Sequence, residues 1–259
     1  MRIAVCIKQV PTREWQPRID ETRRGVREQD ASFEMNEPDA YALEEALRLR
    51  EKHGGEVVVC TAGPARASQV LREGLARGAD RAIHVEDDHL GTADASLVSG
   101  VLADALRDEA FDLVLTSLQS DDQGSAQTGV ILAERLGLPH ATIVMDVQIP
   151  DAGAAPLLLR VKRELEGGWF QWVELPLPAL LTIQSGINQL RYATLKGIMA
   201  AKKKEVRKVA PSTLAPARVV TVKLDVPRKT KQTQMISGSP GEAARDLVRA
   251  LKEDARAIE

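Results

Sequence analysis

Cysteine is scarce in this sequence, with only Cys6 and Cys60 among 259 residues. Small proteins that depend on disulfides carry many more cysteines, so a disulfide framework is excluded. Both cysteines lie inside apolar runs of the sequence. We therefore expect two buried, reduced thiols.

Long hydrophobic runs and an excess of basic charge are also lacking. The formal net charge is −2, whereas a surface built for nucleic acid needs a clear positive surplus. No apolar stretch reaches the roughly 18 residues that would span a bilayer. Residues 1–5 have a strand pattern and not that of a cleavable signal. The sequence predicts a soluble, cytoplasmic protein that neither binds nucleic acid nor inserts into a membrane.

Familiar catalytic motifs are missing as well. There is no Gly-Lys-Ser/Thr of a Walker A loop, no GxGxxG after the first strand pattern and no GxSxG nucleophile elbow. None of the four histidines forms a metal-binding pair with a cysteine: His53, His84, His89 and His140. His84 lies within a strand pattern and is predicted to be a packed side chain. Adjacent Asp121 and Asp122 are more typical of a solvated loop than of a metal site. We predict no metal and no catalytic residue, which favours a nucleotide-binding module over a hydrolase.

The first half of the chain alternates short apolar runs with amphipathic stretches. The apolar runs predict strands at 2–8, 56–62, 81–86 and 111–117. The amphipathic stretches predict helices at 38–50, 64–77, 94–107 and 126–136. Near-continuous apolar strands separated by helices imply a parallel sheet that is covered on both faces. The predicted fold class is therefore α/β, with a doubly wound, mainly parallel, Rossmann-like sheet.

The pattern changes beyond the fourth predicted helix. After an apolar run at 140–149, strand patterns at 157–165 and 169–175 flank Gly167-Gly168, which predicts a hairpin. A further apolar strand is predicted at 178–183. These segments either extend the parallel sheet or form an antiparallel annex to it.

From Asn188 onward the chain becomes polar and basic, with one strand predicted at 219–226. Ser239, Pro240 and Glu242 have the pattern of a helix start with a reciprocal cap. The helix that follows aligns apolar side chains on one face: Ala244, Leu247, Val248, Leu251 and Ala255. We predict a nucleotide-binding domain over 1–187 and, over 188–259, a recognition loop and an arm that packs on a partner chain. An arm that folds back on its own domain is the alternative.

Two loops that follow predicted strands are candidates for a ligand site. Residues 60–64 form a turn of small residues, and 117–129 form a longer polar loop that contains glycine; each precedes a helix. In a doubly wound sheet, ligands bind at the carboxyl ends of the strands. Small side chains permit close approach there, and free N–H groups at a helix start favour phosphate. The loops predict a mononucleotide pocket, and ordinary strand–helix turns are the alternative.

Residues 192–204 place Leu195 before a short helix that ends in three lysines, at 202–204. Lysines at a helix C-terminus complement the helix dipole, which is one sufficient explanation. The other is a docking site, in which an exposed leucine anchor and a basic rim receive an acidic partner.

Several motifs follow one another along nearly the whole chain: IKQVP at 7–11, MNEP at 35–38, ALEEA at 42–46, GADRAIHV at 78–85, VKRELEGG at 161–168, LPALLT at 177–182 and RYATLKGIMAAKKK at 191–204. Together they resemble the β (small) subunit of the electron transfer flavoproteins. The stretch 161–182 is the most specific, and 191–204 is similar to the recognition loop of that family.

The resemblance implies an αβ heterodimer that relays electrons without substrate chemistry of its own. FAD would be held mainly by the α subunit, and AMP would be a structural ligand of the β subunit. The positions that match the AMP site are Cys6, Asn36, Ala62, Asp121, Asp122, Gln123, Gly124, Ser125, Ala126, Gln127, Thr128 and Gly129.

The resemblance also implies partners in fatty acid oxidation. Leu195 matches the leucine that anchors acyl-CoA dehydrogenases and related dehydrogenases, and four neighbours would share the docking surface: Tyr192, Ile198, Met199 and Lys202. Glu164 matches an acidic position near the mobile flavin domain. These positions predict one surface for partner docking and one contact to the flavin domain.

Some positions depart from the family pattern. Arg13 and Pro38 stand where some relatives place aromatic residues against the flavin, so direct flavin contacts there are not expected. Trp169 and Trp172 flank the hairpin turn, where smaller residues are more usual.

Three alternatives remain beside the AMP-binding form. One branch of the family replaces AMP by a second FAD and bifurcates electrons from NADH, but residues 127–129 resemble the AMP-binding form. An ATP-binding module of the universal-stress type shares the strand–helix plan, yet it leaves the basic run and the arm unexplained. An adenylating enzyme would need a pyrophosphate-binding loop, which this sequence lacks.

Overall fold

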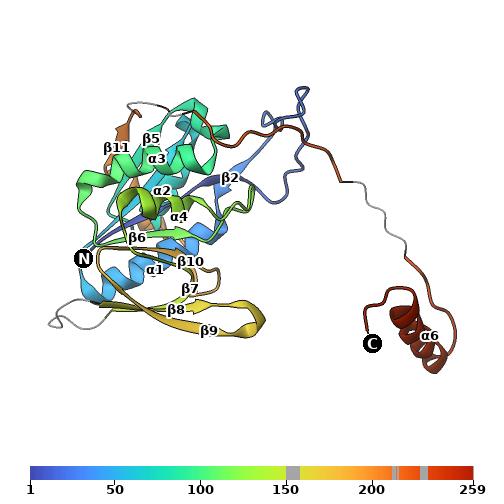
Figure 1. Ribbon diagram of the computed structural model, residues 1–259. Helices are drawn as coiled ribbons and strands as arrows, with labels where there is room; N and C mark the ends of the chain where they lie inside the picture. The colour runs from blue at the N-terminus through green and yellow to red at the C-terminus, as the bar shows by residue number, and fades with distance from the viewer. Residues whose placement is uncertain (150–157, 212–213, 215, 228–232, 259) are drawn as a thin grey trace. The chain divides into compact units, whose positions relative to one another are not determined.

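The computed structural model describes residues 1–149, 158–211, 214, 216–227 and 233–258 (Figure 1). These residues divide into two compact units, Met1–Val222 and Lys223–Glu259. None of the helices in the described part of the chain is long and apolar enough to cross a membrane.

The first unit is built on one large sheet. Seven of its strands run parallel: β1 (Arg2–Cys6), β4 (Glu56–Gly63), β5 (Arg81–Glu86), β6 (Leu113–Ser117), β7 (His140–Gln148), β10 (Ala179–Ile183) and β11 (Val206–Val209). Two run antiparallel, β8 (Leu158–Glu164) and β9 (Phe170–Pro176). The order of the nine strands is β11-β5-β4-β1-β6-β10-β7-β8-β9, so the β8–β9 hairpin lies at one margin and β11 at the other (Figure 1).

Helices cover both faces of this sheet because its strands are apolar on both sides. On β1, Ile3 and Val5 join the core beneath α1 (Glu37–His53) and α2 (Ser68–Arg77). The intervening Ala4 joins the core beneath α3 (Ala95–Leu106) and α4 (Thr128–Leu136). The predicted doubly wound, mainly parallel fold is confirmed.

The second half of the sheet combines the two arrangements that the sequence left open. Residues of β10 insert between β6 and β7 and continue the parallel sheet. The predicted hairpin extends the same sheet in antiparallel fashion, through β8 and β9. Residue 157, the first of the predicted hairpin, lies outside the described residues.

Short elements complete the first unit. The strands β2 (Gln9–Pro11) and β3 (Phe33–Met35) form a separate antiparallel pair, and four 3-10 turns are present: η1 (Ala65–Ala67), η2 (Asp88–Thr92), η3 (Arg107–Glu109) and η4 (Glu166–Gly168). The strands β2, β3 and β11 were not predicted from the sequence. Strand β11 has charged residues at its centre and so lacks the apolar pattern of the other strands. These charged residues are tolerated because β11 lies at the sheet margin, where their side chains are exposed.

The strand predicted at 219–226 is wrong. Four apolar residues in it are at least 69% exposed, and no strand among the described residues pairs with them: Val219, Val220, Val222 and Val226. The backbone N–H groups of Arg218 and Val219 instead donate to the carboxylate of Asp94, at 2.6 and 2.8 Å. A β-branched run forms a strand only where another strand accepts its hydrogen bonds.

The second unit contains α6 (Pro240–Glu253). Its start is the predicted reciprocal cap, because the Ser239 N–H donates to Oε2 of Glu242 at 2.9 Å and both partners of the capping box are present. Leu247 and Val248 on its apolar face are about half exposed. The packing of this unit on a partner chain stays a prediction.

Leu47 and Leu195 allow the core to be tested with the same chemical change at two sites. Leu47 on α1 is fully buried, and Leu195 is 80% exposed. We expect Leu47→Ala to lower the free energy of unfolding by about 2–5 kcal/mol through the cavity it leaves. We expect Leu195→Ala to change it by less than about 0.5 kcal/mol. Urea unfolding followed by circular dichroism measures both, and equal losses would contradict the assignment of the core.

Candidate functional site

A cavity lies where the order of the strands reverses. From β1 the chain adds β4 and β5 on one side, then crosses to place β6 on the other side of β1. The carboxyl ends of β1 and β6, at Cys6 and Ser117, therefore face a crevice that no connection covers. Both residues line the cavity, together with Ala62 from β4.

Most of the residues that the sequence predicted for nucleotide binding meet on the wall of this cavity. Nine of them line it: Cys6, Asn36, Ala62, Gln123, Ser125, Ala126, Gln127, Thr128 and Gly129. The other three, Asp121, Asp122 and Gly124, belong to the same loop but not to the lining.

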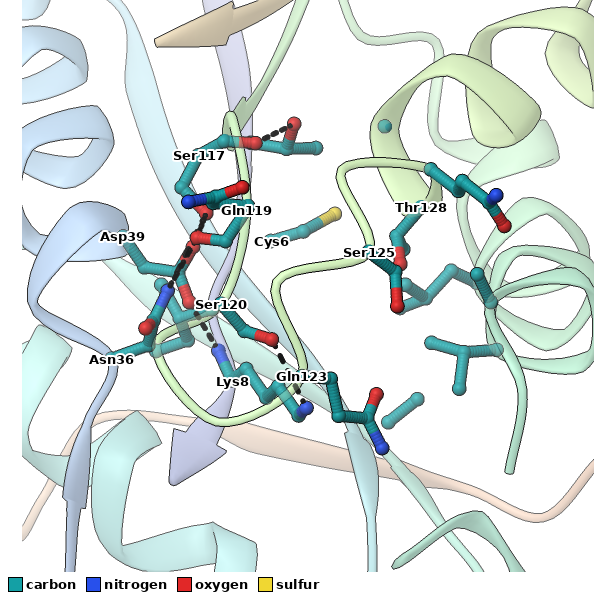
Figure 2. Close-up of a pocket in the computed structure, with 18 of the residues that line it drawn as sticks. Cys6, Lys8, Asn36, Asp39, Ser117, Gln119, Ser120, Gln123, Ser125 and Thr128 are labelled. Carbon is teal, nitrogen blue, oxygen red and sulfur yellow. Dashed lines mark hydrogen bonds between the residues drawn. The ribbon is translucent and has the colours of Figure 1, made fainter. Parts of the chain in front are cut away.

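Asn36 holds the loop that follows β6. Its side chain is fully buried, and its Nδ2 lies 3.4 Å from Oγ of Ser117 and donates to the carbonyl of Gln119 at 3.3 Å. Its Oδ1 accepts the backbone N–H of Asp121 at 2.9 Å. Figure 2 shows this cluster on one side of the pocket, with Ser125 and Thr128 on the other side. Because one amide satisfies groups on three loop residues, Asn36 fixes the shape of the wall.

Two ion pairs tie the same loop to the N-terminal part of the chain. Nζ of Lys8 lies 2.7 Å from both carboxylate oxygens of Asp122 and 3.3 Å from Oγ of Ser120. The Arg13 guanidinium donates to Asp121 at 3.2 Å and also pairs with Glu37. Asp121 and Asp122 thus pair with cations of the protein, which explains why neither carboxylate faces the cavity.

The N-terminus of α4 forms the wall around Ser125 and Thr128. The first N–H groups of a helix have no partner within the helix, and they favour an anion such as phosphate. Ala126, just before the helix, has a φ of 53°, so the chain turns through the left-handed region and α4 begins two residues later than predicted. A Cβ on Gly129 would lie 2.5 Å from Oγ1 of Thr116 and 2.8 Å from Cγ2 of Thr182. Only glycine lets the helix start approach β6 and β10 this closely.

A different part of the wall is apolar. It comes from η2 and the start of α3, and its residues are Leu90, Gly91, Ala93, Ala95 and Val98. The small side chains leave a surface that suits an aromatic ring. This wall was not predicted, because the sequence does not show that η2 and α3 approach the ends of β1 and β4.

A buried carboxylate lies at the base of the site. Asp39 on α1 is only 4% exposed, and its Oδ2 accepts the backbone N–H of Lys8 at 2.7 Å. Burial, which disfavours the charged form, raises the pKa of Asp39 to about 6. Burial, with a smaller effect of Asp39, raises the pKa of the Cys6 thiol to about 12, so this cysteine is a packed thiol.

Several lining residues were not predicted as site residues: Lys8, Asp39, Ser117, Gln119 and Ser120. Ser117, Gln119 and Ser120 belong to the polar loop 117–129. The position of this loop after a predicted strand was the feature of the sequence that could have identified them. Asp39 lies within a helix pattern that carries no such signal. The predicted packed histidine, His84, is fully buried, with Nε2 3.2 Å from the carbonyl of Gly63.

The predicted docking residues lie on a separate, exposed segment. Their exposed fractions are 89% for Tyr192, 80% for Leu195, 44% for Ile198 and 59% for Met199, and Lys202 is exposed as well. All but Tyr192 and Lys202 belong to α5 (Leu195–Ala201). The helix is capped by the Thr194 hydroxyl, which accepts the N–H of Gly197 at 3.0 Å.

The predicted docking segment, residues 191–202, is held firmly on its own chain although its apolar side chains are exposed. The Arg191 guanidinium donates to both oxygens of the buried Glu44, at 2.7 and 2.9 Å, and to Glu51 at 2.6 and 3.1 Å. A Cβ on Gly197 would lie 2.2 Å from the carbonyl of Ala76, so α5 packs directly on α2.

Glu164 ends β8 at the hairpin turn, where its Oε2 accepts a hydrogen bond from Nε2 of Gln184 at 3.0 Å. Trp169 beside the turn is 75% exposed, and Trp172 lies beneath the guanidinium of Arg160, 4.5 Å from the ring centroid. Among the residues described, no group of three or more side chains has the arrangement of a metal site.

The raised pKa of Asp39 has a consequence for stability. Because the folded state holds this proton up to about pH 6, it binds more protons than the unfolded chain between about pH 4 and 6. The free energy of unfolding therefore falls as the pH rises through this range. We expect Asp39→Asn to remove roughly 2–3 kcal/mol of that fall. The free energy of unfolding of the variant should therefore rise relative to that of the wild type between pH 4 and pH 7. Urea unfolding of the full chain at each pH measures the difference. The exposed Asp104→Asn is the control, and a difference that does not vary with pH would contradict the assignment.

Comparison with known proteins identifies the family of this chain. Residues 24–214 match the electron transfer flavoprotein domain. The chain is 37% identical to the electron transfer flavoprotein subunit β of Methylophilus methylotrophus, over 98% of each chain. It is 36% identical to the same subunit of Homo sapiens, over 99% of this chain and 98% of the relative. It is also 41% identical to subunit CarD of the caffeyl-CoA reductase–Etf complex of Acetobacterium woodii, over 78% of this chain and 75% of the relative. The chain belongs to the electron transfer flavoprotein family, among the relatives named as its β subunits.

Proposed function

We propose that this chain is the β subunit of a heterodimeric electron carrier, with AMP as a structural ligand in the cavity between β1 and β6. FAD is held mainly by the α subunit, where it accepts electrons from one partner and passes them to another. The observation that carries the proposal is the cavity at the strand reversal, whose wall contains nine of the twelve residues that match the family's AMP site.

The chemistry of the wall fits a nucleoside monophosphate. The start of α4, with Ser125 and Thr128, offers amides and hydroxyls to one phosphate group. The small-residue wall from η2 and α3 suits the flat base. Asn36 and Asp39 hold polar oxygens near the ends of β1 and β6, where they are within reach of ribose hydroxyls or the edge of the base.

The side chains around the cavity favour binding over catalysis. Apart from Lys8, they are amides, hydroxyls and apolar groups, together with two candidates for reaction chemistry, Cys6 and Asp39, which are both buried. The Cys6 thiol has its pKa raised to about 12 by burial, which suppresses the reactive thiolate. Asp39 is already hydrogen-bonded, to the Ser117 hydroxyl and to the backbone N–H of Lys8, and the described lining residues include no histidine. This supports a carrier subunit without substrate chemistry of its own.

We further propose that the docking segment receives acyl-CoA and related dehydrogenases. Leu195 is the anchor because it is the most exposed apolar residue of α5 and stands at the start of a rigidly seated helix. Tyr192, Ile198 and Met199 surround it, and Lys202 adds a positive rim. Exposed apolar side chains on a rigid support are typical of interface hot spots. Glu164, at a different edge of the sheet, is the proposed contact to the flavin domain.

A second candidate is a carrier of the bifurcating type, with a second FAD in the cavity in place of AMP. One relative, at 41% identity, is named as a subunit of a caffeyl-CoA reductase–Etf complex, so carriers similar to this chain also occur in complex with a reductase. We favour AMP because the wall around α4 offers one set of phosphate donors and residues 127–129 resemble the AMP-binding form.

The nucleotide content of the purified complex tests the first proposal. We expect co-expression with the α subunit to yield a heterodimer that releases one FAD and one AMP on denaturation, measured by chromatography of the supernatant. Two FAD and no AMP would replace the proposal by the bifurcating type. A chain that purifies without a partner and releases ATP would point to the stress-protein type.

The docking proposal predicts a selective effect of Leu195→Ala. Truncation of a buried interface anchor typically costs about 1 kcal/mol or more, so the KM of the carrier in reduction by an acyl-CoA dehydrogenase should rise about fivefold or more. The flavin spectrum and thermal unfolding should not change, because Leu195 makes little contact with its own chain. Val220→Ala, at a residue 71% exposed outside α5, is the matched control. An unchanged KM would remove Leu195 from the proposal.

A further inference from the structure

The wall of the nucleotide cavity is poor in positive charge. Among the described residues that line it, only Lys8 and Asp39 carry a formal charge, and they have opposite signs. Every other lining side chain is neutral. A phosphate in this cavity would therefore rely on neutral donors for almost all of its binding.

The lysine is already neutralised by the protein. Its Nζ lies 2.7 Å from both oxygens of Asp122, and the pair is only partly exposed, with 37% and 25% of the two side chains accessible. The next cation along the chain, Arg13, is shared by Asp121 and Glu37. The loop and its surroundings therefore hold two cations and four carboxylates. The cations are Lys8 and Arg13, and the carboxylates are Glu37, Asp39, Asp121 and Asp122.

This balance suits one phosphate and opposes a longer chain of phosphates. The amides at the start of α4 and the hydroxyls of Ser125 and Thr128 are sufficient for a single phosphate group. A triphosphate carries about two more negative charges, and phosphate-binding loops that accept it add a free lysine and a divalent cation. Here the lysine is not free, and an acidic pair stands beside it.

We propose that the Lys8–Asp122 pair sets the number of phosphates that the cavity accepts, so that nucleoside monophosphates are bound and di- and triphosphates are rejected. The proposal rests on the nucleotide site described above. Asp122 acts as a specificity-determining residue without touching the ligand: it cancels the charge of Lys8, so that this lysine offers no free positive charge to a second phosphate.

The test compares AMP, ADP and ATP on the heterodimer after its bound nucleotide has been removed. Titration calorimetry in EDTA at low salt gives the ratio of the ATP and AMP dissociation constants for each variant. We expect Asp122→Asn, which frees Lys8, to shift this ratio in favour of ATP by about five- to tenfold. We expect Lys8→Met, which leaves Asp122 unpaired, to shift it by a similar factor in favour of AMP. Both shifts should shrink towards unity in 0.5 M salt, because the pair is partly exposed.

Asp225→Asn is the matched control. Asp225 forms a Lys–Asp pair with Lys223 at the same distance of 2.7 Å, outside the residues that line the cavity. The Asp225→Asn change removes the same charge as Asp122→Asn. The ratio of the ATP and AMP dissociation constants should therefore equal that of the wild type. Thermal unfolding shows whether each variant is folded, and the two single changes predict opposite shifts, so either one tests the proposal if the other fails to fold.

The outcomes separate this proposal from the one on which it rests. If the wild-type complex binds AMP and the ratio does not move in the folded variants, or moves equally in the control, the specificity role of the pair is overturned. If the stripped wild-type complex binds none of the three nucleotides, the nucleotide site itself is overturned.

Discussion

After β5 the chain crosses from one side of β1 to the other before it forms β6, and this crossing leaves the carboxyl ends of β1 and β6 uncovered. The constraint is topological: two connections that leave neighbouring strands in opposite directions cannot both fill the space between the strand ends. The strands themselves are apolar on both sides and hold the crevice rigid, with Ile3, Val5 and Leu113 among the fully buried residues. The cavity, its polar loop and the start of α4 all follow from this one feature.

The polar groups at the crevice are organised by residues at the start of α1. Asn36 satisfies groups on three residues of the loop after β6, and Asp39 accepts an N–H from the chain just beyond β1. Burial of an amide is tolerated because its oxygen and nitrogen are hydrogen-bonded. Burial of a carboxylate with only partial compensation is costly, which raises its pKa. These energetic costs fall on the residues that shape the pocket, which is consistent with the proposed binding site.

The proposed docking surface shows the opposite arrangement, in which exposure is combined with rigidity. Arg191 forms a bidentate salt bridge with Glu44 and further hydrogen bonds with Glu51. Gly197 allows α5 to pack directly against α2. A surface held this way loses little freedom when a partner binds, because its helix is already ordered. The two proposed sites therefore use the same sheet in different ways, one at its carboxyl edge and one on a helix packed outside it.

Much of the architecture could be read from local pattern. Runs of Val, Ile and Leu at strand length predicted the central parallel strands, because a sheet covered on both faces needs apolar residues at every position. The motif Ser239 to Glu242 predicted the start of α6, because a reciprocal cap is a local interaction. The polar loop 117–129 predicted most of the pocket, because strand ends and helix starts are themselves local features.

The tertiary structure decided what depended on distant residues. The run 219–226 has the composition of a strand but pairs with no strand of the described residues, whereas the charged β11 pairs with β5 at the sheet margin. Asp121 and Asp122 were predicted to line the pocket with the rest of their loop. In the structure their carboxylates pair with Arg13 and Lys8 instead, and the sequence does not show that these cations lie beside the loop. Local sequence sets which conformations a segment prefers. Strand pairing, charge compensation and burial depend on which other segments lie beside it. These segments are far apart in the chain: 114 residues separate Lys8 from Asp122, and 147 separate Glu44 from Arg191.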